Sequence, residues 1–562
     1  MVDAGGRRPI EHAETLAYHL LRHADGMPEK VAFTFLADGE DIESELTFGE
    51  LRQRSQSIAR VLIRAGLTGE AVVLFHPPGR EFIAAFCGCL MAGVVAVPLQ
   101  PPITRRLLDR AQAVFADCAA AAVLTTTAGV AGVESLVTSR GLRLITTDRL
   151  VEVPGEVSPA AIRPSSAAVL QYTSGSTGSP KGVVITHGNL ISNSTQIGQA
   201  FGTRPTDIGV NWLPLLHDMG LIGNIVHVIH QGITCVHMTP QAMIRKPIRW
   251  LRAVARFRAT ISGGPDFAWR LLSERVRADD LVGLDLSCWR VAFSGAEQVR
   301  PSTIDQVTDL LTPTGFRETA FLPCYGMAEA TLIISGGPCE RLPRISRPDG
   351  AAADSLGYVA CGQPVPAGSV AIVDPVASIR RPDGQVGEIW VTGAHIAAGY
   401  WGKDEQTDLT FHAHLPCDPR RWLRTGDLGF LRAGQLYISG RIKDLLIVNG
   451  RKHHPEDLEA TVQTQVPGCG AGVAAAFQAE VDGLPRLVIA VEMAERPEDQ
   501  PAHTKLVDAI RNAVWSHHEI LIDAVAVVRT GRLPRTTSGK VRRGETRDLW
   551  TAGTLAAGVA HV

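Results

Sequence analysis

The sequence predicts an α/β protein: a large N-terminal domain of parallel α/β sheets with a β-rich subdomain, and a small α+β C-terminal domain. Apolar strand-like runs at 71–75, 121–124 and 167–170 are separated by stretches long enough for crossover helices, which is typical of parallel sheets. From about residue 355 the pattern changes to short strands and Gly/Asp turns, and it changes again after Gly440. The expected domains are residues 1–440, with the β-rich part at about 355–440, and 441–562.

Length and composition agree with this prediction. A chain of 562 residues has room for three or four compact units and a large core. Hydrophobic residues make up 45% and charged residues 20%, as in soluble globular proteins, which disfavours long disorder and fibrous architectures. The 55 Lys and Arg against 57 Asp and Glu leave a net charge of −2, which disfavours nucleic acid and anionic lipid as partners. Ten scattered cysteines and the absence of an apolar signal core predict a cytoplasmic location.

Local signals place the first elements. Thr47 begins a capping box, and apolar residues behind it repeat at helical spacing until Gly66, which predicts an amphipathic helix. The uncharged stretch 82–99 approaches the length of a membrane span, but Gly93 and Pro98 interrupt it. We interpret it as a short core helix followed by a buried strand.

Later elements follow from the same signals. In the β-rich part we expect strands at 370–373, 387–391 and 435–438. Beyond it we expect helices at 455–462 and 505–515, strands at 487–491 and 525–528, and then a basic loop. The Gly/Ala-rich end, residues 551–562, is expected to fray.

A loop of hydroxyls, glycines and one lysine directly follows the run 167–170. It reads Tyr172-Thr173-Ser174-Gly175-Ser176-Thr177-Gly178-Ser179-Pro180-Lys181-Gly182. Glycine amides, hydroxyl donors and the charge of Lys181 suit a polyphosphate. Because Gly182 follows Lys181, the loop lacks the Ser or Thr of the P-loop NTPase signature. A flexible linker is disfavoured, because linkers rarely lie between two buried strands.

Together with five later segments, this loop resembles the motifs of the adenylate-forming superfamily, which contains acyl-CoA synthetases, nonribosomal adenylation domains, luciferases and fatty acyl-AMP ligases. The later segments are Ser294-Gly295-Ala296-Glu297, Tyr325-Gly326-Met327-Ala328-Glu329-Ala330-Thr331, Arg424-Thr425-Gly426-Asp427-Leu428-Gly429, Gly440-Arg441-Ile442-Lys443-Asp444 and Pro534-Arg535-Thr536-Thr537-Ser538-Gly539-Lys540. The six matches occur in order and cover essentially the whole chain. The resemblance implies a small C-terminal domain that is mobile, with the active site between the domains.

The resemblance also implies which residues bind ATP or AMP. Tyr325 would stack on adenine, Asp427 would accept hydrogen bonds from the ribose hydroxyls, and Arg441 would assist there. The implied nucleotide-binding residues are Thr173, Ser174, Gly175, Ser176, Thr177, Gly178, Lys181, Ser294, Gly295, Ala296, Glu297, Tyr325, Gly326, Met327, Ala328, Asp427, Arg441 and Lys540.

Catalytic roles are implied in the same way. Lys540 matches the catalytic lysine, which reaches the substrate carboxylate and the α-phosphate, where charge accumulates. Thr177 and Glu329 would hold Mg²⁺, because hydroxyl and carboxylate oxygens suit this ion. His217 matches the residue that gates the acyl channel, and Lys443 matches the hinge of the small domain. In isolation these residues would more often be ordinary core or surface residues.

Within the superfamily, segments 211–223, 262–268 and 450–459 resemble fatty acyl-AMP ligases. Ile447 stands where acyl-CoA synthetases usually carry lysine, which favours a carrier protein over CoA as the acceptor. The chain departs from the pattern of these ligases in two places. The first departure keeps CoA open as an alternative acceptor, and the second concerns the acyl pocket. The segment 333–358 is short for the insertion that disfavours CoA in these ligases. Asp266 stands where Asn is expected, and it either lies near the acyl pocket or caps the next helix.

Several nearby residues carry less information. Asp218 is interpreted as structural, and a metal site at the adjacent His453 and His454 is disfavoured. The apolar residues that could line an acyl channel, or could equally be ordinary core, are Ile222, Ile225, Met238, Phe267 and Trp269.

The sequence thus predicts a ligase that uses ATP and Mg²⁺ to convert a medium- or long-chain fatty acid to acyl-AMP and pyrophosphate. The acyl group would then pass to the phosphopantetheine thiol of an acyl carrier protein, in fatty acid metabolism or in polyketide or lipopeptide biosynthesis. The alternatives are an acyl-CoA synthetase and, from another class, a non-catalytic sensor of nucleotide or acyl ligand.

Overall fold

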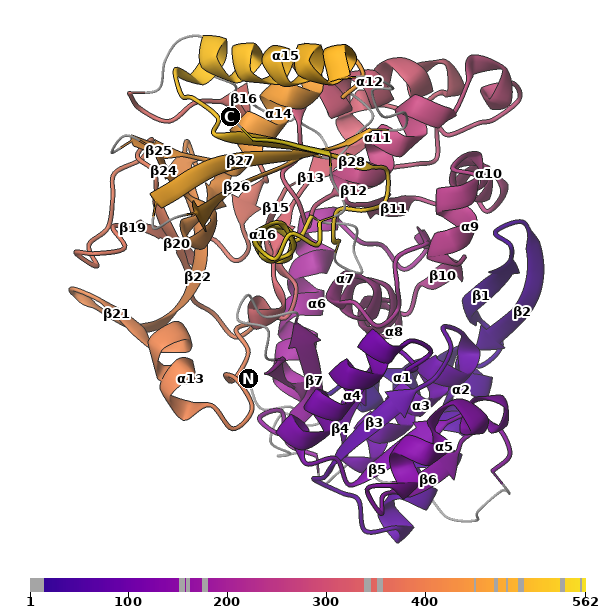
Figure 1. Ribbon diagram of the computed structural model, residues 1–562. Helices are drawn as coiled ribbons and strands as arrows, with labels where there is room; N and C mark the ends of the chain where they lie inside the picture. Colours follow the sequence, from indigo (N-terminus) through magenta and orange to yellow (C-terminus); the bar gives the residue numbers. More distant parts are fainter. Residues whose placement is uncertain are drawn as a thin grey trace.

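The computed structural model describes residues 15–150, 157, 162–173, 180–337, 345–350, 357–448, 451–469, 474–481, 484–493, 500–535, 541–555 and 558–561. It has the expected α/β architecture, with largely parallel sheets in the N-terminal part and β-rich and α+β parts further along the chain. In Figure 1 the N-terminal sheet and its helices form the lower right of the molecule, and the C-terminal strands cross the top.

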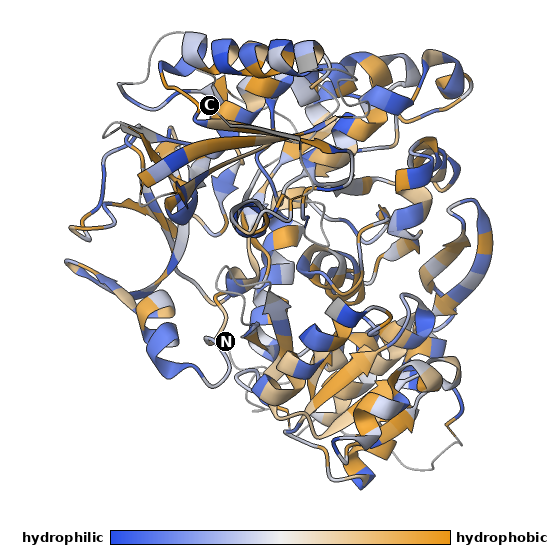
Figure 2. Ribbon diagram, in the orientation of Figure 1, coloured by the Kyte–Doolittle hydropathy of each residue, from blue (hydrophilic) through white to orange (hydrophobic). Residues whose placement is uncertain are grey.

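The first N-terminal sheet has the strand order β6-β5-β3-β4-β7-β8, in which only β7 and β8 pair antiparallel. Helices cover both faces, so the strands are apolar without alternation, as Figure 2 shows. Its elements are β3 (Ala71–Phe75), α3 (Arg80–Ala92), β4 (Val95–Pro98), α4 (Arg105–Cys118), β5 (Ala122–Thr125), α5 (Val130–Thr138), β6 (Arg143–Thr146), β7 (Ala167–Thr173) and β8 (Lys181–Thr186).

The helix signals near the N-terminus are confirmed. Helix α2 (Phe48–Arg64) follows Thr47, whose side chain accepts from the Glu50 amide while the Glu50 carboxylate accepts from the Thr47 amide. Helix α3 packs closely on α2 at Gly88, where an added Cβ would lie only 2.7 Å from Ile58. The stretch 82–99 is a buried helix and strand, as expected.

The second N-terminal sheet has the order β13-β12-β11-β9-β10-β1-β2 and is parallel except for the β1–β2 hairpin. Its strands are β1 (Val31–Ala37), β2 (Asp41–Thr47), β9 (Ile208–Asn211), β10 (Thr234–His237), β11 (Ile261–Gly264), β12 (Val291–Ser294) and β13 (Phe321–Pro323). The helices of this part are α1 (Leu16–Gly26), α6 (His187–Phe201), α7 (Asp218–Leu221), α8 (His227–Gln231), α9 (Pro240–Arg245), α10 (Ile248–Arg256), α11 (Asp266–Arg275) and α12 (Pro301–Leu311).

The β-rich part agrees with the expected strands and extends them. Strand β22 is long and pairs with β20, β21 and β23. Its elements are β14 (Tyr325–Gly326), β15 (Ile333–Gly336), β16 (Ile345–Ser346), β17 (Tyr358–Val359), β18 (Gln363–Pro364), β19 (Val370–Val373), β20 (Gly387–Val391), α13 (Asp404–Phe411), β21 (Ala413–Leu415), β22 (Asp418–Arg432) and β23 (Gln435–Arg441).

The C-terminal region is built on the sheet β26-β27-β28-β29, with a separate apolar cluster on each face. The expected helices and strands are present with longer bounds. They are β24 (Leu446–Val448), β25 (Arg451–His453), α14 (Pro455–Gln465), β26 (Ala474–Val481), β27 (Leu484–Met493), α15 (Gln500–His518), β28 (Ala524–Arg529), α16 (Arg543–Thr551) and β29 (Gly558–His561).

The expectation that residues 551–562 fray is wrong for the last strand. Residues 558–561 pair antiparallel with β28. Composition gave no signal for this strand, because edge pairing depends on backbone N–H and C=O groups that any sequence carries.

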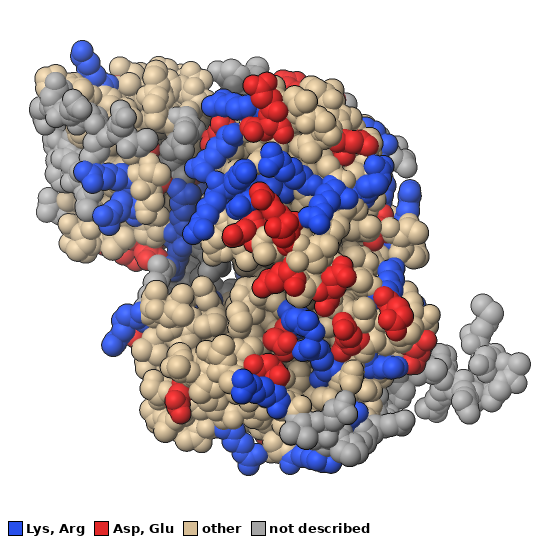
Figure 3. Space-filling model, turned by 90° about the vertical axis from the view of Figure 1, so that its right-hand side faces the viewer, with Lys and Arg blue, Asp and Glu red and all other residues tan. Residues whose placement is uncertain are grey.

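The surface carries mixed charge. On the face shown in Figure 3, basic and acidic side chains lie interleaved. Glu40, for example, pairs with Lys246 at 3.7 Å and with Arg249 at 3.1 Å. Among the described helices, none is both long and apolar enough to cross a membrane.

Behind the second sheet lies a cluster of buried aromatic side chains. Trp250 on α10 is at its centre, with ring centroids 4.8 Å from Trp269 and 5.5 Å from Trp289. The Trp250 indole N–H also donates to Ser262 Oγ on β11 at 2.7 Å. The cluster therefore fixes helices against the sheet that bears one side of the large cavity described below.

We expect Trp250→Ala to lower the free energy of unfolding by about 3–5 kcal/mol, because it leaves a cavity and removes the donor to Ser262 Oγ, which keeps only its bond to the Val210 carbonyl. Urea unfolding followed by circular dichroism would measure the loss. Trp515→Ala is the matched control, since Trp515 on α15 is 52% exposed and its removal should change stability by less than about 0.5 kcal/mol. Equal effects of the two substitutions would contradict this assignment of the cluster.

Candidate active site

A cavity of about 1160 Å³ lies where the two N-terminal sheets, the β-rich part and the C-terminal region meet. Its wall includes residues of β7 and β8, of the segment after β12, of the middle of β22 (residues 424–427) and of the end of β23 with the turn that follows it (residues 441–443). Gln171 and Tyr172 lie near the carboxyl end of β7, and Gly295 and Ala296 directly follow β12, so this part of the cavity has the usual position of ligand sites in α/β sheets.

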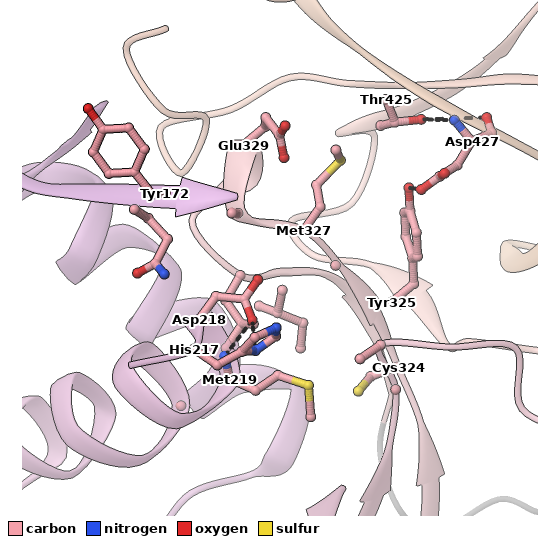
Figure 4. A pocket seen from close by; sticks show the side chains of 18 of the residues that line it. Tyr172, His217, Asp218, Met219, Cys324, Tyr325, Met327, Glu329, Thr425 and Asp427 are labelled. Atoms are coloured by element: carbon pink, nitrogen blue, oxygen red, sulfur yellow. Dashed lines mark hydrogen bonds and ion pairs between the residues drawn. The ribbon is translucent and has the colours of Figure 1, made fainter. Parts of the chain in front are cut away.

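One corner of the cavity is polar. The Tyr325 hydroxyl donates to Asp427 Oδ2 at 2.7 Å, and Arg441 Nε lies 2.9 Å from Asp427 Oδ1 (Figure 4). Burial raises the pKa of Tyr325, and the charge of Asp427 raises the pKa of Arg441. The corner therefore holds a fixed carboxylate beside an aromatic ring.

Asp427 is held by the turn that precedes it. Thr425 Oγ1 donates to the Ile389 carbonyl at 2.7 Å and accepts from the Asp427 amide at 3.0 Å. Gly426 adopts φ +69°, a left-handed conformation that favours glycine. Its amide donates to buried Glu388 at 3.2 Å. The segment that looked like an ordinary turn in the sequence is thus anchored to β20 at several points.

A second polar group lies toward the β7–β8 hairpin. Lys181 Nζ stands 5.1 Å from the Tyr400 ring centroid, and the Tyr400 hydroxyl donates to Glu329 Oε1 at 3.0 Å. Burial raises the pKa of Glu329. The loop residues Ser174, Gly175, Ser176, Thr177 and Gly178 lie outside the described residues, as does the side chain of Thr173.

The Ser294–Glu297 segment divides between wall and core. Gly295 and Ala296 line the cavity, and Ala296 has φ +70°, a strained value for a residue with a Cβ. Ser294 is buried, and Glu297 Oε1 accepts from the Phe267 amide at 2.6 Å. Neither of these two side chains is in the cavity wall.

The Tyr325 segment contributes more of the wall. Gly326, Met327 and Ala328 line the cavity next to Tyr325 and Glu329. Gly326 is required by close packing, since a Cβ there would lie 1.8 Å from the Leu332 carbonyl oxygen.

His217 lines the cavity beside Asp218 and Met219, on a different side from Tyr325 and Asp427 (Figure 4). Its Nδ1 is 2.6 Å from Asp218 Oδ1, and the preceding Leu216 carbonyl accepts from Gln171 Nε2 at 3.0 Å. Sequence reasoning treated Asp218 as structural, but Asp218 lines the cavity beside His217. Gln171 was missed, because a polar residue within a strand gives no signal of its own.

Beyond His217 the cavity becomes largely apolar. Phe201 and Phe293 stack there, with ring centroids 5.6 Å apart, and Met219, Val228 and Ile233 line the walls. The apolar residues considered from the sequence are core, not cavity wall: Ile222, Ile225, Met238, Phe267 and Trp269. Composition could not separate the two, because both environments are apolar.

The C-terminal region contributes basic residues to the cavity. The cavity wall includes Lys443, Arg535 and Arg542. It also includes Arg441, the last residue of β23 before the C-terminal region. Lys540 lies outside the described residues, but the chain on either side is fixed. Arg535 forms an isolated β-bridge with Val541 and an ion pair of 2.5 Å with Glu492.

Asp266 does not reach the cavity, and it caps a helix other than its own. It begins α11, yet its oxygens accept from the Arg300 amide at 3.2 Å and from Thr303 Oγ1 at 3.1 Å, in the first turn of α12. Burial raises its pKa to about 6. The sequence left two interpretations of Asp266 open. A position near the acyl pocket is wrong, and helix capping is correct, but the capped helix is α12.

Comparison with known proteins identifies the class. Residues 20–401 match the AMP-binding enzyme family, and residues 443–559 match the AMP domain of Disco-interacting protein 2-like proteins. The chain therefore belongs to the AMP-binding enzyme family.

Within this family the chain is similar to fatty acid ligases. It is 36% identical to the medium-chain fatty acid–acyl carrier protein ligase JamA of Moorena producens, over 94% of each chain. It is 37% identical to the long-chain fatty acid–AMP ligase FadD26 of Mycobacterium marinum, over 93% of this chain and 95% of the relative.

Solved structures agree. A fatty acid AMP ligase from Legionella pneumophila matches with a TM-score of 0.72 and 33% identity, over 98% of each chain. A fatty acyl-adenylate ligase from the same organism, solved with acyl adenylate and pyrophosphate, matches with the same score over 96% of each chain.

We expect Asp266→Asn to stabilise the protein at pH 8 relative to the parent, by about 2 kcal/mol more than at pH 4. Between about pH 4 and pH 6 the folded protein retains a proton at Asp266 that the unfolded chain has released. Stability therefore falls as pH rises through this window, and the full penalty is present above it. Asn keeps an acceptor and carries no charge.

Urea unfolding at both pH values would measure this difference. Asp508→Asn is the matched control, because Asp508 on α15 is exposed. A stability difference independent of pH for Asp266→Asn would contradict the assignment.

Proposed function

We propose that this protein is an ATP- and Mg²⁺-dependent ligase that activates a medium- or long-chain fatty acid and passes it to an acyl carrier protein. One observation carries the proposal. A single cavity joins the polar corner of Tyr325, Asp427 and Arg441 to an apolar part, and His217 also lines it. Such a cavity suits a nucleotide at one end and an acyl chain at the other, and the two would meet where a carboxylate must attack a phosphate.

In the first step, a carboxylate oxygen of the fatty acid attacks the α-phosphorus of ATP. A new P–O bond forms, the bond to the β-phosphate breaks, and pyrophosphate leaves. Tyr325 would contact adenine, and Asp427 with Arg441 would hold the ribose. Residues 173–178 with Lys181 would bind the phosphates, and Lys540 would stabilise charge on the reacting oxygens.

Mg²⁺ would lie near Glu329. Magnesium is commonly held by one or two protein oxygens together with substrate phosphates. Glu329 fits this role, because its carboxylate lines the cavity and burial disfavours its charge unless a cation is near. Thr177 would supply a hydroxyl oxygen. When bound, the ion would neutralise phosphate charge.

In the second step, the thiol of phosphopantetheine attacks the acyl carbonyl of acyl-AMP. A C–S bond forms, AMP leaves with the oxygen, and the thiol proton passes to solvent. We assign residues 1–440 to the adenylating domain, including a β-rich subdomain at about 355–440, and residues 441–562 to a mobile domain. Lys443 would be the hinge that removes Lys540 and opens a path for the thiol.

The acceptor is tested by incubating the purified protein with ATP, Mg²⁺ and fatty acids from short to long chain. Either CoA or a phosphopantetheinylated carrier protein is then added, and every acyl product is identified by mass spectrometry. We expect acyl-AMP with medium or long chains, and discharge onto the carrier protein only. Rapid formation of acyl-CoA would assign the protein to the synthetases, and no adenylate with any acid would favour the sensor.

For the catalytic lysine, we expect Lys540→Ala to abolish fatty-acid-dependent exchange of pyrophosphate into ATP without altering the circular dichroism spectrum. The matched control is Lys505→Ala, since Lys505 is an exposed lysine on α15. Parental exchange by the Lys540 variant would show that this residue is not catalytic.

A further inference from the structure

Two polar side chains, Asn224 and His227, lie in the apolar part of the cavity wall. Asn224 lies in a π-helical turn (Ile222–Val226) between α7 and α8, is only 8% exposed, and lines the cavity. A π-helical turn inside a helix is rare and is often found at a functional site. Asn224 has no place in the adenylation chemistry described above.

The orientation of the Asn224 amide follows from its hydrogen bond. Nδ2 donates to the Met219 carbonyl oxygen at 2.9 Å. A carbonyl oxygen can only accept, so the NH₂ group must face Met219 and Oδ1 must face away from it. Within the described part of the chain, this is the hydrogen bond that the side chain makes. The acceptor Oδ1 is therefore available to a ligand.

The other polar side chain in this part of the wall has no acceptor atom available to a ligand. His227 lies one turn further along the helix, and its Nδ1 is 3.0 Å from Ser194 Oγ, while its Nε2 is 3.0 Å from Thr203 Oγ1. Both ring nitrogens are engaged by protein. Val228 and Ile233 have no polar side-chain atoms, so Asn224 offers an acceptor among apolar surfaces.

Leaving a buried amide oxygen without a donor costs about 1–3 kcal/mol, and an unsubstituted alkyl chain has no donor to supply. A hydroxyl group on the chain would supply one.

Resting on the proposed function, we propose that the acyl channel is built for a fatty acid that carries a hydroxyl group along its chain, with Asn224 Oδ1 accepting the hydroxyl hydrogen. Asn224 lies seven residues beyond His217 on one helical segment, and its amide turns back along this segment to the Met219 carbonyl. The test therefore scans the position of the hydroxyl along the whole chain.

The test compares pairs of fatty acids of equal length, each unsubstituted or hydroxylated at successive carbons, in pyrophosphate exchange. At one or two positions of the chain we expect kcat/KM to be roughly tenfold higher for the hydroxylated acid, the factor that one hydrogen bond of ordinary strength supplies. In Asn224→Leu, which has nearly the same side-chain size, the ratio should fall to one or below. Because both acids are measured on one sample, partial misfolding lowers both rates and leaves the ratio unchanged.

Asn512→Leu is the matched control, since Asn512 is exposed on α15, and it should keep the parental ratio. Equal kcat/KM for both members of every pair would overturn the inference and leave the proposed function standing. If no acid is adenylated, the proposed function fails, and calorimetric titration of the same acids then decides the inference separately. Tighter binding of a hydroxylated acid that is lost in Asn224→Leu would support it, and equal binding would overturn it.

Discussion

Asp427 and Arg441 face each other on neighbouring strands, β22 and β23, and their 2.9 Å ion pair also holds the hydroxyl of Tyr325. Asp427 is 5% exposed, so its charge is tolerated only because the Arg441 cation and the Tyr325 hydroxyl contact it. Tyr325 comes from β14, more than a hundred residues earlier in the chain. Arg441 is the residue with which β23 ends and the C-terminal region begins. The polar corner of the site and the position of the C-terminal region therefore both depend on the ion pair of Asp427 and Arg441.

The cavity combines two environments that a single element could not provide. Its polar side is built from strand ends and turns, where backbone groups and short side chains can be fixed by hydrogen bonds, as at Thr425 and Gly426. Its apolar side is built from the helical segment after His217 and from the second N-terminal sheet. The two sides share one cavity with His217 and Asp218, so a fatty acid bound there could present its carboxylate to a nucleotide. The membership in the AMP-binding enzyme family gives this arrangement its chemical meaning.

Much of the fold could be predicted because the signals were local. The capping box at Thr47 and the uninterrupted apolar strand β3 depend on neighbours within a few residues, and the structure has them where the sequence indicated. Predictions based on composition were less successful. The apolar residues after His217 alternate between core and cavity wall with the turn of a helix that contains a π-helical segment, so the periodicity of a regular helix could not assign them. Asp266 likewise caps a helix 34 residues further on, a partner that no sequence window contains.

The sequence by itself determined the class of the protein: the order of strands and helices, and the six motifs that resemble the adenylate-forming superfamily. These depend on short stretches of chain, and chemistry such as phosphate binding needs residue types that stand next to one another. Only the tertiary structure decided which side chains share a cavity. It placed Asp218 and Gln171 in the wall, withdrew Ser294 and Glu297 from it, and turned an amide oxygen of Asn224 away from Met219 toward the acyl channel. The physical reason is that burial and hydrogen-bond geometry depend on contacts between segments far apart in the chain, and no local pattern encodes those contacts.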